Sequence, residues 1–262
     1  MNYALLDTVR REKPLVHHIT NWVTIYDCAA VVKAFGASPV MAHAQEEVED
    51  MVKLASAVVL NIGTLTAEVV DAMVLAARAA NRKGIPVVLD ACGAGATPYR
   101  DRACARLLAE ARIDILKGNV SEVGRLAGVE AATRGVDAGA VAGDPATIAR
   151  QLAARRNCTV VITGRTDIVA SATRCVRVSN GCDAMGVVVG TGCMAASVIG
   201  TFAAVCKDTV EAAVVGLCCY EVAAELAAPG NPGPMAFKHA MIDRCVSLTV
   251  AEVTSRARIA EE

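Results

Sequence analysis

Short runs of apolar residues alternate with longer amphipathic segments along the first two thirds of the chain. The apolar runs are rich in Val, Ile and Leu, as in strands that are buried on both faces of a parallel sheet. They predict strands at residues 38–42, 57–62, 86–91, 113–119, 158–164, 167–171 and 174–180. Helices are predicted at residues 23–35, 46–54, 66–83, 101–111 and 145–155. Alternation of this kind predicts an α/β fold built from βαβ units around a mostly parallel sheet.

The pattern changes near the end of the strand-rich region. Only two residues separate the strands at 167–171 and 174–180, which predicts an antiparallel hairpin at one edge of the sheet. From Thr191 onward the pattern predicts helices alone, at 191–205, from Asp208 to about 228, and a last one that ends near 257. The first two are apolar nearly all round, so we expect them to be buried.

Two local signals punctuate this helical region. Asp208 is expected to be an N-cap, with Glu211 three residues later completing a capping box. Residues 228–234 are rich in proline and glycine and predict a break before the last helix. No linker long or polar enough to divide the chain appears, so residues 1–262 are expected to form a single domain.

Composition narrows the class of protein. The formal net charge is −1 and no long basic run occurs, which argues against binding to nucleic acid or to an anionic membrane. The N-terminus has no apolar signal core, and the apolar stretch at 193–205 is too short to span a bilayer, so a cytoplasmic protein is expected. The 11 cysteines include no C-x-x-C pair, which argues against a disulfide framework or structural zinc and against a thiol-redox protein.

Four loops that follow strands combine glycine with an acidic, basic or hydroxyl side chain. They are residues 90–98, 117–122, 163–167 and 190–193. One such loop can be a plain turn. Because ligands bind beyond the carboxyl ends of the strands in open α/β sheets, four of them on one edge indicate a binding site.

Gly190, Thr191 and Gly192 precede a predicted helix and form a natural anion site. Unpaired N–H groups and the helix dipole favour a negative charge there, and glycine lets a phosphate approach the backbone. The run Gly190–Ala195 also matches G-x-G-x-x-A, but it follows the last predicted strand, where no second strand can present a ribose-binding acid. The chain contains no G-x-x-x-x-G-K-[ST], which excludes a P-loop enzyme.

Two acidic residues lie at strand ends where a metal would be useful. Glu122 is three residues after Asn119, at a predicted helix start, and its carboxylate can hold magnesium through water beside a phosphate. The alternative for Glu122 is a capping box with Asn119. Asp90 closes an apolar strand, where a charge needs a partner or a metal, and its alternative is an N-cap or turn acid.

Taken together, these motifs resemble the hydroxyethylthiazole kinases, a branch of the ribokinase-like superfamily. The similarity covers most of the chain, and its most specific motif is Gly36–His43. The other matching segments are 18–21, 23–24, 46–47, 60–65, 89–90, 93–97, 118–122, 163–164, 179–181 and 190–194, with Gly233, Phe237 and Asp243. The resemblance implies a three-layer α/β/α ribokinase-like fold and transfer of a phosphoryl group from ATP to 5-(2-hydroxyethyl)-4-methylthiazole, within thiamine salvage.

The resemblance also implies roles for particular residues. It implies a homotrimer with active sites between subunits, and Mg²⁺ linked to the acids named above, Asp90 and Glu122. The substrate contacts that it implies are Asn21, Met41 and Gly190. The ATP contacts that it implies are Lys117 and Thr163. Gly190, Thr191 and Gly192 would form the anion hole.

Cys193 occupies the helix start where most ribokinase-like kinases carry an aspartate as general base. A helix N-terminus lowers the pKa of a thiol, so Cys193 could accept the proton of the alcohol, or merely position it. The chain departs from the family pattern at Ala91-Cys92, in place of Pro-Val, and at Lys117, in place of arginine. Two alternatives therefore stay open: a kinase for another small heterocyclic alcohol, such as hydroxymethylpyrimidine, and a non-catalytic nucleotide-binding sensor.

Overall fold

A computed structural model describes residues 1–129, 143–230 and 233–262. Its described strands form one sheet of nine strands in the order β2-β1-β3-β4-β5-β6-β7-β8-β9. The strands are β1 (Leu15–Ile19), β2 (Ser38–Val40), β3 (Ala57–Asn61), β4 (Val87–Asp90), β5 (Ile115–Asn119), β6 (Thr159–Thr163), β7 (Asp167–Ala170), β8 (Cys175–Val178) and β9 (Ile259–Glu261). The pairs from β2 to β6 are parallel and the pairs from β6 to β9 are antiparallel, so the sheet is mostly parallel as expected.

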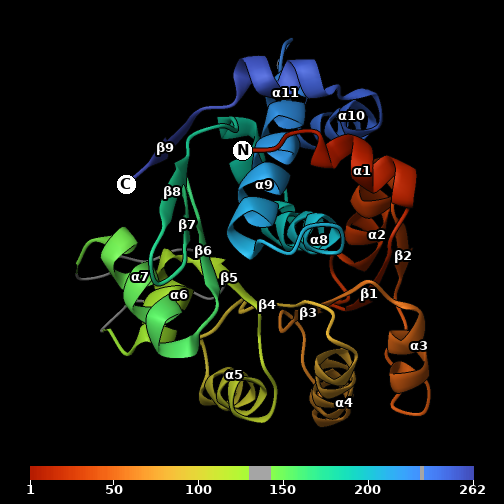
Figure 1. Ribbon diagram of the computed structural model, residues 1–262, viewed down its shortest axis with the longest axis vertical. Coiled ribbons are helices and arrows are strands. Elements are labelled where there is room, and N and C mark those ends of the chain that lie inside the picture. The colour runs from red at the N-terminus through yellow and green to blue at the C-terminus, as the bar shows by residue number, and fades with distance from the viewer. Residues whose placement is uncertain (130–142, 231–232) are drawn as a thin grey trace.

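Helices cover both faces of this sheet (Figure 1). On one face lie α3 (Val48–Leu54), α4 (Ala67–Lys83), α5 (Pro98–Glu110), α6 (Val120–Ala127) and α7 (Pro145–Arg156). On the other lie α1 (Leu5–Glu12), α2 (Ile25–Ala34), α8 (Thr191–Ala203), α9 (Thr209–Ala227), α10 (Pro234–Ser247) and α11 (Val250–Arg256). This is the three-layer α/β/α arrangement that the sequence predicted. Within the described residues, no helix is both long enough and apolar enough to cross a membrane.

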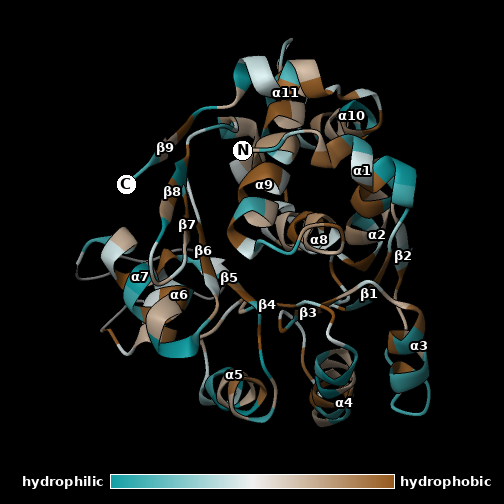
Figure 2. Ribbon diagram, viewed as in Figure 1, coloured by the Kyte–Doolittle hydropathy of each residue, from teal (hydrophilic) through white to brown (hydrophobic). Residues whose placement is uncertain are grey.

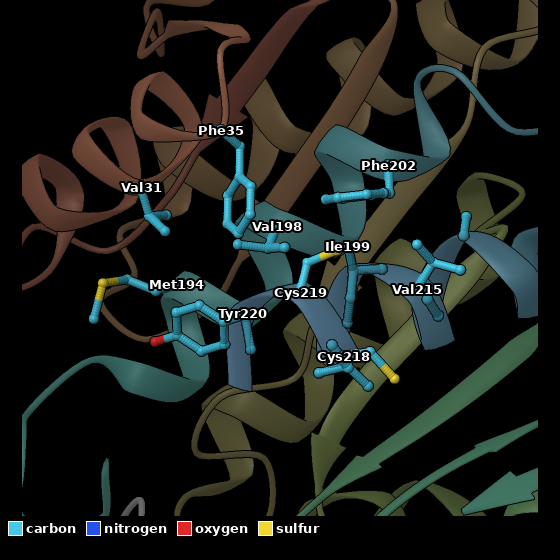
Figure 3. Packing of buried hydrophobic residues seen from close by; sticks show 14 of the residues in the cluster. Val31, Phe35, Met194, Val198, Ile199, Phe202, Val215, Cys218, Cys219 and Tyr220 are labelled. Atoms are coloured by element: carbon cyan, nitrogen blue, oxygen red, sulfur yellow. The ribbon is translucent and has the colours of Figure 1, made fainter. Parts of the chain in front are cut away.

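Helices α8 and α9 form the centre of one core. Both are buried on nearly all sides, as their apolar sequences predicted. Figure 3 shows side chains of α8 and α9 packed together with Val31 of α2 and with Phe35, which follows α2. The ring of Phe202 meets that of Phe35 edge to face, with their centroids 5.7 Å apart. Gly200 lets α8 lie directly on the sheet, because a Cβ there would collide with Val59.

Hydropathy follows the layers (Figure 2). The central strands are hydrophobic, whereas the outer faces of α3, α4 and α5 carry hydrophilic residues. Strands β3 and β4 are buried at every position, which is why their sequences are continuous apolar runs rather than alternating ones.

All eleven cysteines are free, and Cys218 and Cys219 are fully buried in the core.

The structure differs from the elements predicted from the sequence at the two ends of the chain. The pattern missed α1 and β1, because His17 and His18 interrupt the apolar run of β1 although both are completely buried. The prediction of helices alone after Thr191 was wrong, since β9 adds an antiparallel strand to β8. The hairpin of β7 and β8 is real but is therefore not the edge of the sheet.

Three details of the helical region also differ. The prediction of a single last helix was wrong, because α10 ends at Ser247 and Thr249 caps a separate helix, α11, with its own capping box. Asp208 caps α9 as expected, but Glu211 accepts a hydrogen bond from the backbone of Asn2 instead of closing a box. The expected break at 228–234 includes Asn231 and Pro232, which lie outside the described residues.

Candidate active site

The four glycine-containing loops meet at one end of the sheet, as the sequence predicted. The backbone N–H of Gly93, after β4, donates to the Glu122 carboxylate, after β5, at 2.6 Å. Thr163, at the end of β6, donates to the carbonyl of Gly118 at 3.5 Å. The fourth loop joins them through Gly192, where a Cβ would lie 3.1 Å from the Lys117 ammonium.

Gly190 is the N-cap of α8, a helix of 13 residues whose N-terminus opens on this site. Its φ of 92° is in the left-handed region, and a Cβ at this position would collide with Thr24. The turn is held by Thr191, which donates to the carbonyl of Met185 at 3.2 Å, and by Tyr220, which donates to the carbonyl of Thr191 at 3.2 Å. The first N–H groups of α8 thus form a rigid, positively polarised turn.

A chain of buried side chains links the start of α8 to β3, β4 and β5. The Asn21 amide donates to the Cys193 Sγ at 3.3 Å and to the Asn61 Oδ1 at 3.0 Å. The Asn61 amide in turn donates to the Asp90 Oδ2 at 2.6 Å. Lys117 donates to the Asp90 Oδ1 at 3.2 Å and completes the chain. We call these five residues the acceptor-side network, because they include Cys193, the candidate for accepting the proton of the alcohol.

Electrostatics within this network favour a thiolate and a fixed cation. The pKa of Cys193 lies well below its usual range, because the neighbouring Cys92 thiol and the charge of Lys117 favour its thiolate, although burial opposes the shift. Burial raises the pKa of Asp90, and Lys117 opposes that shift. Burial works against the charge of Lys117, but Asp90 and Glu122 outweigh it and raise the pKa of that ammonium. Lys117 therefore stays charged beside Gly192.

Glu122 has the capping geometry that was one of its two interpretations. Its Oε2 accepts from the N–H of Asn119 at 2.6 Å, and the Asn119 side chain accepts from the N–H of Glu122 at 2.9 Å. Its other oxygen binds Gly93, so the same carboxylate ties the loop after β4 to the loop after β5. Asp90 is neither an N-cap nor a turn acid, because it ends β4 and pairs with Lys117. A role in holding a metal stays a prediction for both acids.

The structure brings together most of the residues that the sequence selected. Asn21, Asp90, Lys117 and Cys193 share the acceptor-side network, and Gly192 of the anion hole lies against Lys117. Met41 is separate: it follows β2 at the edge of the sheet, with β1 between that strand and β3.

Sequence reasoning overlooked three contributors to the site. Asn61 bridges Asn21 and Asp90, and its signal was a polar residue at the carboxyl end of an apolar strand. Cys92 was noted only as a departure from a pattern, yet it is the largest cause of the lowered pKa of Cys193. Arg100, on α5, donates to the carbonyls of Ile62, Gly63 and Cys92 at 2.7–2.8 Å and so clamps two site loops together. No sequence pattern reveals a contact of this kind.

A cavity of about 710 Å³ opens beside the start of α8. Thr163 and Gly164 line it from the end of β6, and Thr191 and Gly192 line it from α8. Its volume lies within the range of small-molecule sites, roughly 300–1,000 Å³. The site therefore has two sides, with the anion hole between the acceptor-side network and this cavity.

Comparison with known proteins connects this geometry to a function. The chain matches the model of the hydroxyethylthiazole kinase family over residues 6–251. It is 52% identical over 257 residues to the hydroxyethylthiazole kinase of Methanosarcina acetivorans, covering 98% of each chain. The structure of the hydroxyethylthiazole kinase from Pyrococcus horikoshii matches with a TM-score of 0.91 and 36% identity, over 99% of this chain and 98% of that one.

More distant structures share the fold alone. A ribokinase-like superfamily protein from Enterococcus faecalis matches with a TM-score of 0.66 at 14% identity, over 94% of this chain and 95% of its own. The three-layer architecture is therefore that of the ribokinase-like proteins.

Proposed function

Because the chain belongs to the hydroxyethylthiazole kinase family, we propose that it transfers the terminal phosphoryl group of ATP to the hydroxyl of 5-(2-hydroxyethyl)-4-methylthiazole. The product is the thiazole phosphate used to make thiamine phosphate. One observation in the structure supports this most directly. At the positively polarised start of α8, the buried ammonium of Lys117 lies against Gly192, and the thiol of Cys193 is in the first turn. An anion-binding turn beside a proton acceptor is what phosphoryl transfer to an alcohol requires.

The anion hole does most of the work in this mechanism. Charge spreads over the oxygens of the phosphoryl group as it transfers, and positioning plus neutralisation supply most of the rate. The N–H groups of Gly190, Thr191 and Gly192 and the ammonium of Lys117 are already in place, so no group has to reorganise as the charge develops. Lys117 and Thr163 are the proposed ATP contacts: Thr163 lines the cavity, and the Lys117 ammonium lies against Gly192.

Cys193 receives or orients the hydroxyl of the acceptor. Its sulfur is in the first turn of α8, where the helix dipole and the Cys92 donor favour the thiolate. The Asn21 amide holds the sulfur in place and belongs to the proposed substrate pocket, together with Gly190 and Met41. A thiolate here can take the proton of the alcohol as the oxygen bonds to phosphorus.

Mg²⁺ is implied by the family, and the donor set fits one way of holding it. Within the described ranges, no group of three or more His, Cys, Asp or Glu side chains gathers into a metal cage. Asp90 and Glu122 instead offer two carboxylates at the edge of the phosphate site, each of whose oxygens keeps a lone pair. This suits Mg²⁺, which keeps several waters and takes one or two carboxylates plus phosphate oxygens. When bound, the ion would neutralise charge on the phosphates.

We also propose a homotrimeric, cytoplasmic enzyme that forms a single domain over residues 1–262. The continuous sheet supports one domain. Large apolar side chains stay exposed around the mouth of the site, which supports contact with a neighbouring subunit there. They are Trp22, Val23, Tyr26, Val187 and Val189. Light scattering of the purified protein tests this, and a monomeric mass would exclude the trimer.

The proposed function is tested by incubating purified protein with ATP, Mg²⁺ and the thiazole alcohol, then measuring ADP and the phosphorylated product. The pyrimidine alcohol, 4-amino-5-hydroxymethyl-2-methylpyrimidine, is assayed in parallel. Phosphorylation of the thiazole alone is expected. Activity on the pyrimidine alone would replace the substrate, and nucleotide binding without turnover of either alcohol would favour a sensor.

A further inference from the structure

Two buried carboxyl side chains lie together in the wall of the 710 Å³ cavity. Asp167 begins β7 and is 3% exposed, and Glu221 is in α9 and is 6% exposed. The two carboxyl groups lie close enough together that each shifts the pKa of the other. Asp167 also accepts from the N–H of Gly164 at 2.9 Å, whereas the buried Oε2 of Glu221 has no donor among the described residues.

Two neighbouring carboxylates in a buried site cannot both carry a charge without a large cost, so this pair keeps a proton. Burial first, and then the charge of Asp167, raise the pKa of Glu221 to about 11. The charged groups around the pair do not change this result. Glu225, on the same helix, adds negative charge and is itself held by Arg258, while Arg258 and Lys117 act weakly in the opposite direction. At neutral pH the pair thus carries one proton and one negative charge.

The position of the pair relates it to the anion hole. Tyr220, the neighbour of Glu221, donates to the carbonyl of Thr191, so this part of α9 packs against the first turn of α8. Thr191, Gly192 and Ala195 line the cavity together with Glu221. A polyphosphate whose terminal group lies at the anion hole extends away from the acceptor-side network, and the cavity is the space on that side. Its remaining part, a nucleoside, has room there.

We propose that Glu221, buried beside Asp167 in the cavity wall, is a binding residue for the nucleoside part of ATP. This rests on the proposed function, in which the phosphates of ATP occupy the anion hole. The proton that Glu221 shares with Asp167 prevents a second negative charge near the triphosphate, which would weaken binding. The uncharged acid offers oxygen atoms that can exchange hydrogen bonds with ribose hydroxyls or with the base.

The test compares two ligands that share phosphates and differ in the nucleoside. ADP and inorganic tripolyphosphate are titrated by calorimetry into the wild type and into Glu221→Leu, Glu221→Gln and Glu221→Asp. In Glu221→Leu we expect ADP to bind about tenfold more weakly and tripolyphosphate to bind as in the wild type, because only the nucleoside contact is lost. Glu221→Gln keeps a neutral hydrogen-bonding group and should hold ADP within about twofold of the wild type.

Controls separate a binding role from a structural one. Glu211→Leu, in the first turn of the same helix and outside the cavity lining, should change neither affinity. Equal weakening of ADP and tripolyphosphate by Glu221→Leu, or no weakening of either, would overturn the inference. If Glu221→Leu does not fold, Glu221→Asp decides, because its shorter side chain withdraws the acid from the cavity and should weaken ADP alone. A last outcome is that the variants show the expected binding pattern while the wild type does not phosphorylate the thiazole alcohol. That result would refute the proposed function and leave this inference standing.

Discussion

The two sides of the anion hole solve the problem of buried charge in opposite ways. On the acceptor side, Asp90 is paired with Lys117 and bonded to Asn61. On the cavity side, Asp167 and Glu221 have no lysine or arginine bonded to them in the described structure, and a shared proton takes its place. Burying a charge is costly unless it is paired, so each arrangement is a way to keep acidic residues beside a phosphate site.

The difference follows from what each side must do. The acceptor side holds a cation and a thiol in fixed positions, because the reacting atoms need electrostatic groups that do not reorganise. In our proposal the cavity side admits and releases a nucleotide, and a neutral acid in its wall can hydrogen-bond to that ligand without adding a second charge. The first set of groups is complete within the protein, whereas the second would be completed by a ligand.

The largest expected effect comes from removing the cation of the acceptor side. Lys117→Met leaves Asp90 buried without its partner and should lower the free energy of unfolding by about 3–5 kcal/mol. Phosphoryl transfer should be lost, because the charge beside Gly192 is gone. Urea unfolding and the thiazole assay measure these effects. The double variant Asp90→Asn, Lys117→Met should regain stability but not activity. An unchanged urea midpoint for Lys117→Met would show that the ion pair does not contribute to stability.

The anion hole is tested by one added methyl group. Gly190→Ala places a Cβ at a positive φ and against Thr24, which should move the N–H groups of α8. We expect turnover to fall about 100-fold or more, as for loss of a donor to a developing anion. Gly84 is the matched control, since its φ is 77° and nothing lies within 4 Å of its Cβ position. Gly84→Ala should cost about 1–2 kcal/mol of stability and leave turnover unchanged.

The thiol of the acceptor side is tested directly. Cys193→Ala should lower kcat about 100-fold, at the low end for loss of a general base, since the anion hole stays intact. ADP affinity should not change, because the thiol lies on the acceptor side. Cys104→Ala removes another buried thiol, on α5, and should leave kcat unaltered. Unchanged turnover in Cys193→Ala would mean that its sulfur is only packing.

The smallest expected effect is a shift in pH dependence. The base must be deprotonated, so kcat should fall as pH falls through the pKa of Cys193. Cys92→Val removes the donor that lowers this pKa, so the acidic limb of the kcat profile should move to higher pH. Cys92→Ser keeps a donor and should leave the limb near its original position. Coincident profiles for the wild type and Cys92→Val would show that the Cys92 contact does not tune the base.

Much of the fold could be predicted because local pattern and burial agree in the middle of the chain. The strands from β2 to β8 were recognisable as apolar runs, and α8 and α9 as helices without a polar face. Strand β1 was not recognisable, because two buried histidines break its pattern, and β9 is too short and too exposed to show one. The end of α10 depended on the cap supplied by Thr249, which competes with a continuous helical pattern.

The site divides in the same way. The glycine turn at the start of α8 could be predicted from its sequence, with Cys193 directly after it, whereas their roles in binding and catalysis stay predictions. Asn61 and Arg100 could not be assigned, since each acts on atoms far away in the chain. The Asp167–Glu221 pair was also not predicted: Asp167 stood out only as the acid of one glycine-containing loop, and nothing in the sequence indicates that its neighbour is Glu221, 54 residues later (221 − 167).

By itself, the sequence determined the α/β class, the order of most elements and the glycine turn at the start of α8, because these depend on backbone preferences and on burial along contiguous segments. Only the tertiary structure decided which acid pairs with a lysine and which keeps a proton. The pKa of a buried group depends on the charges and donors that the fold places within a few ångströms of it, and those come from distant strands and helices.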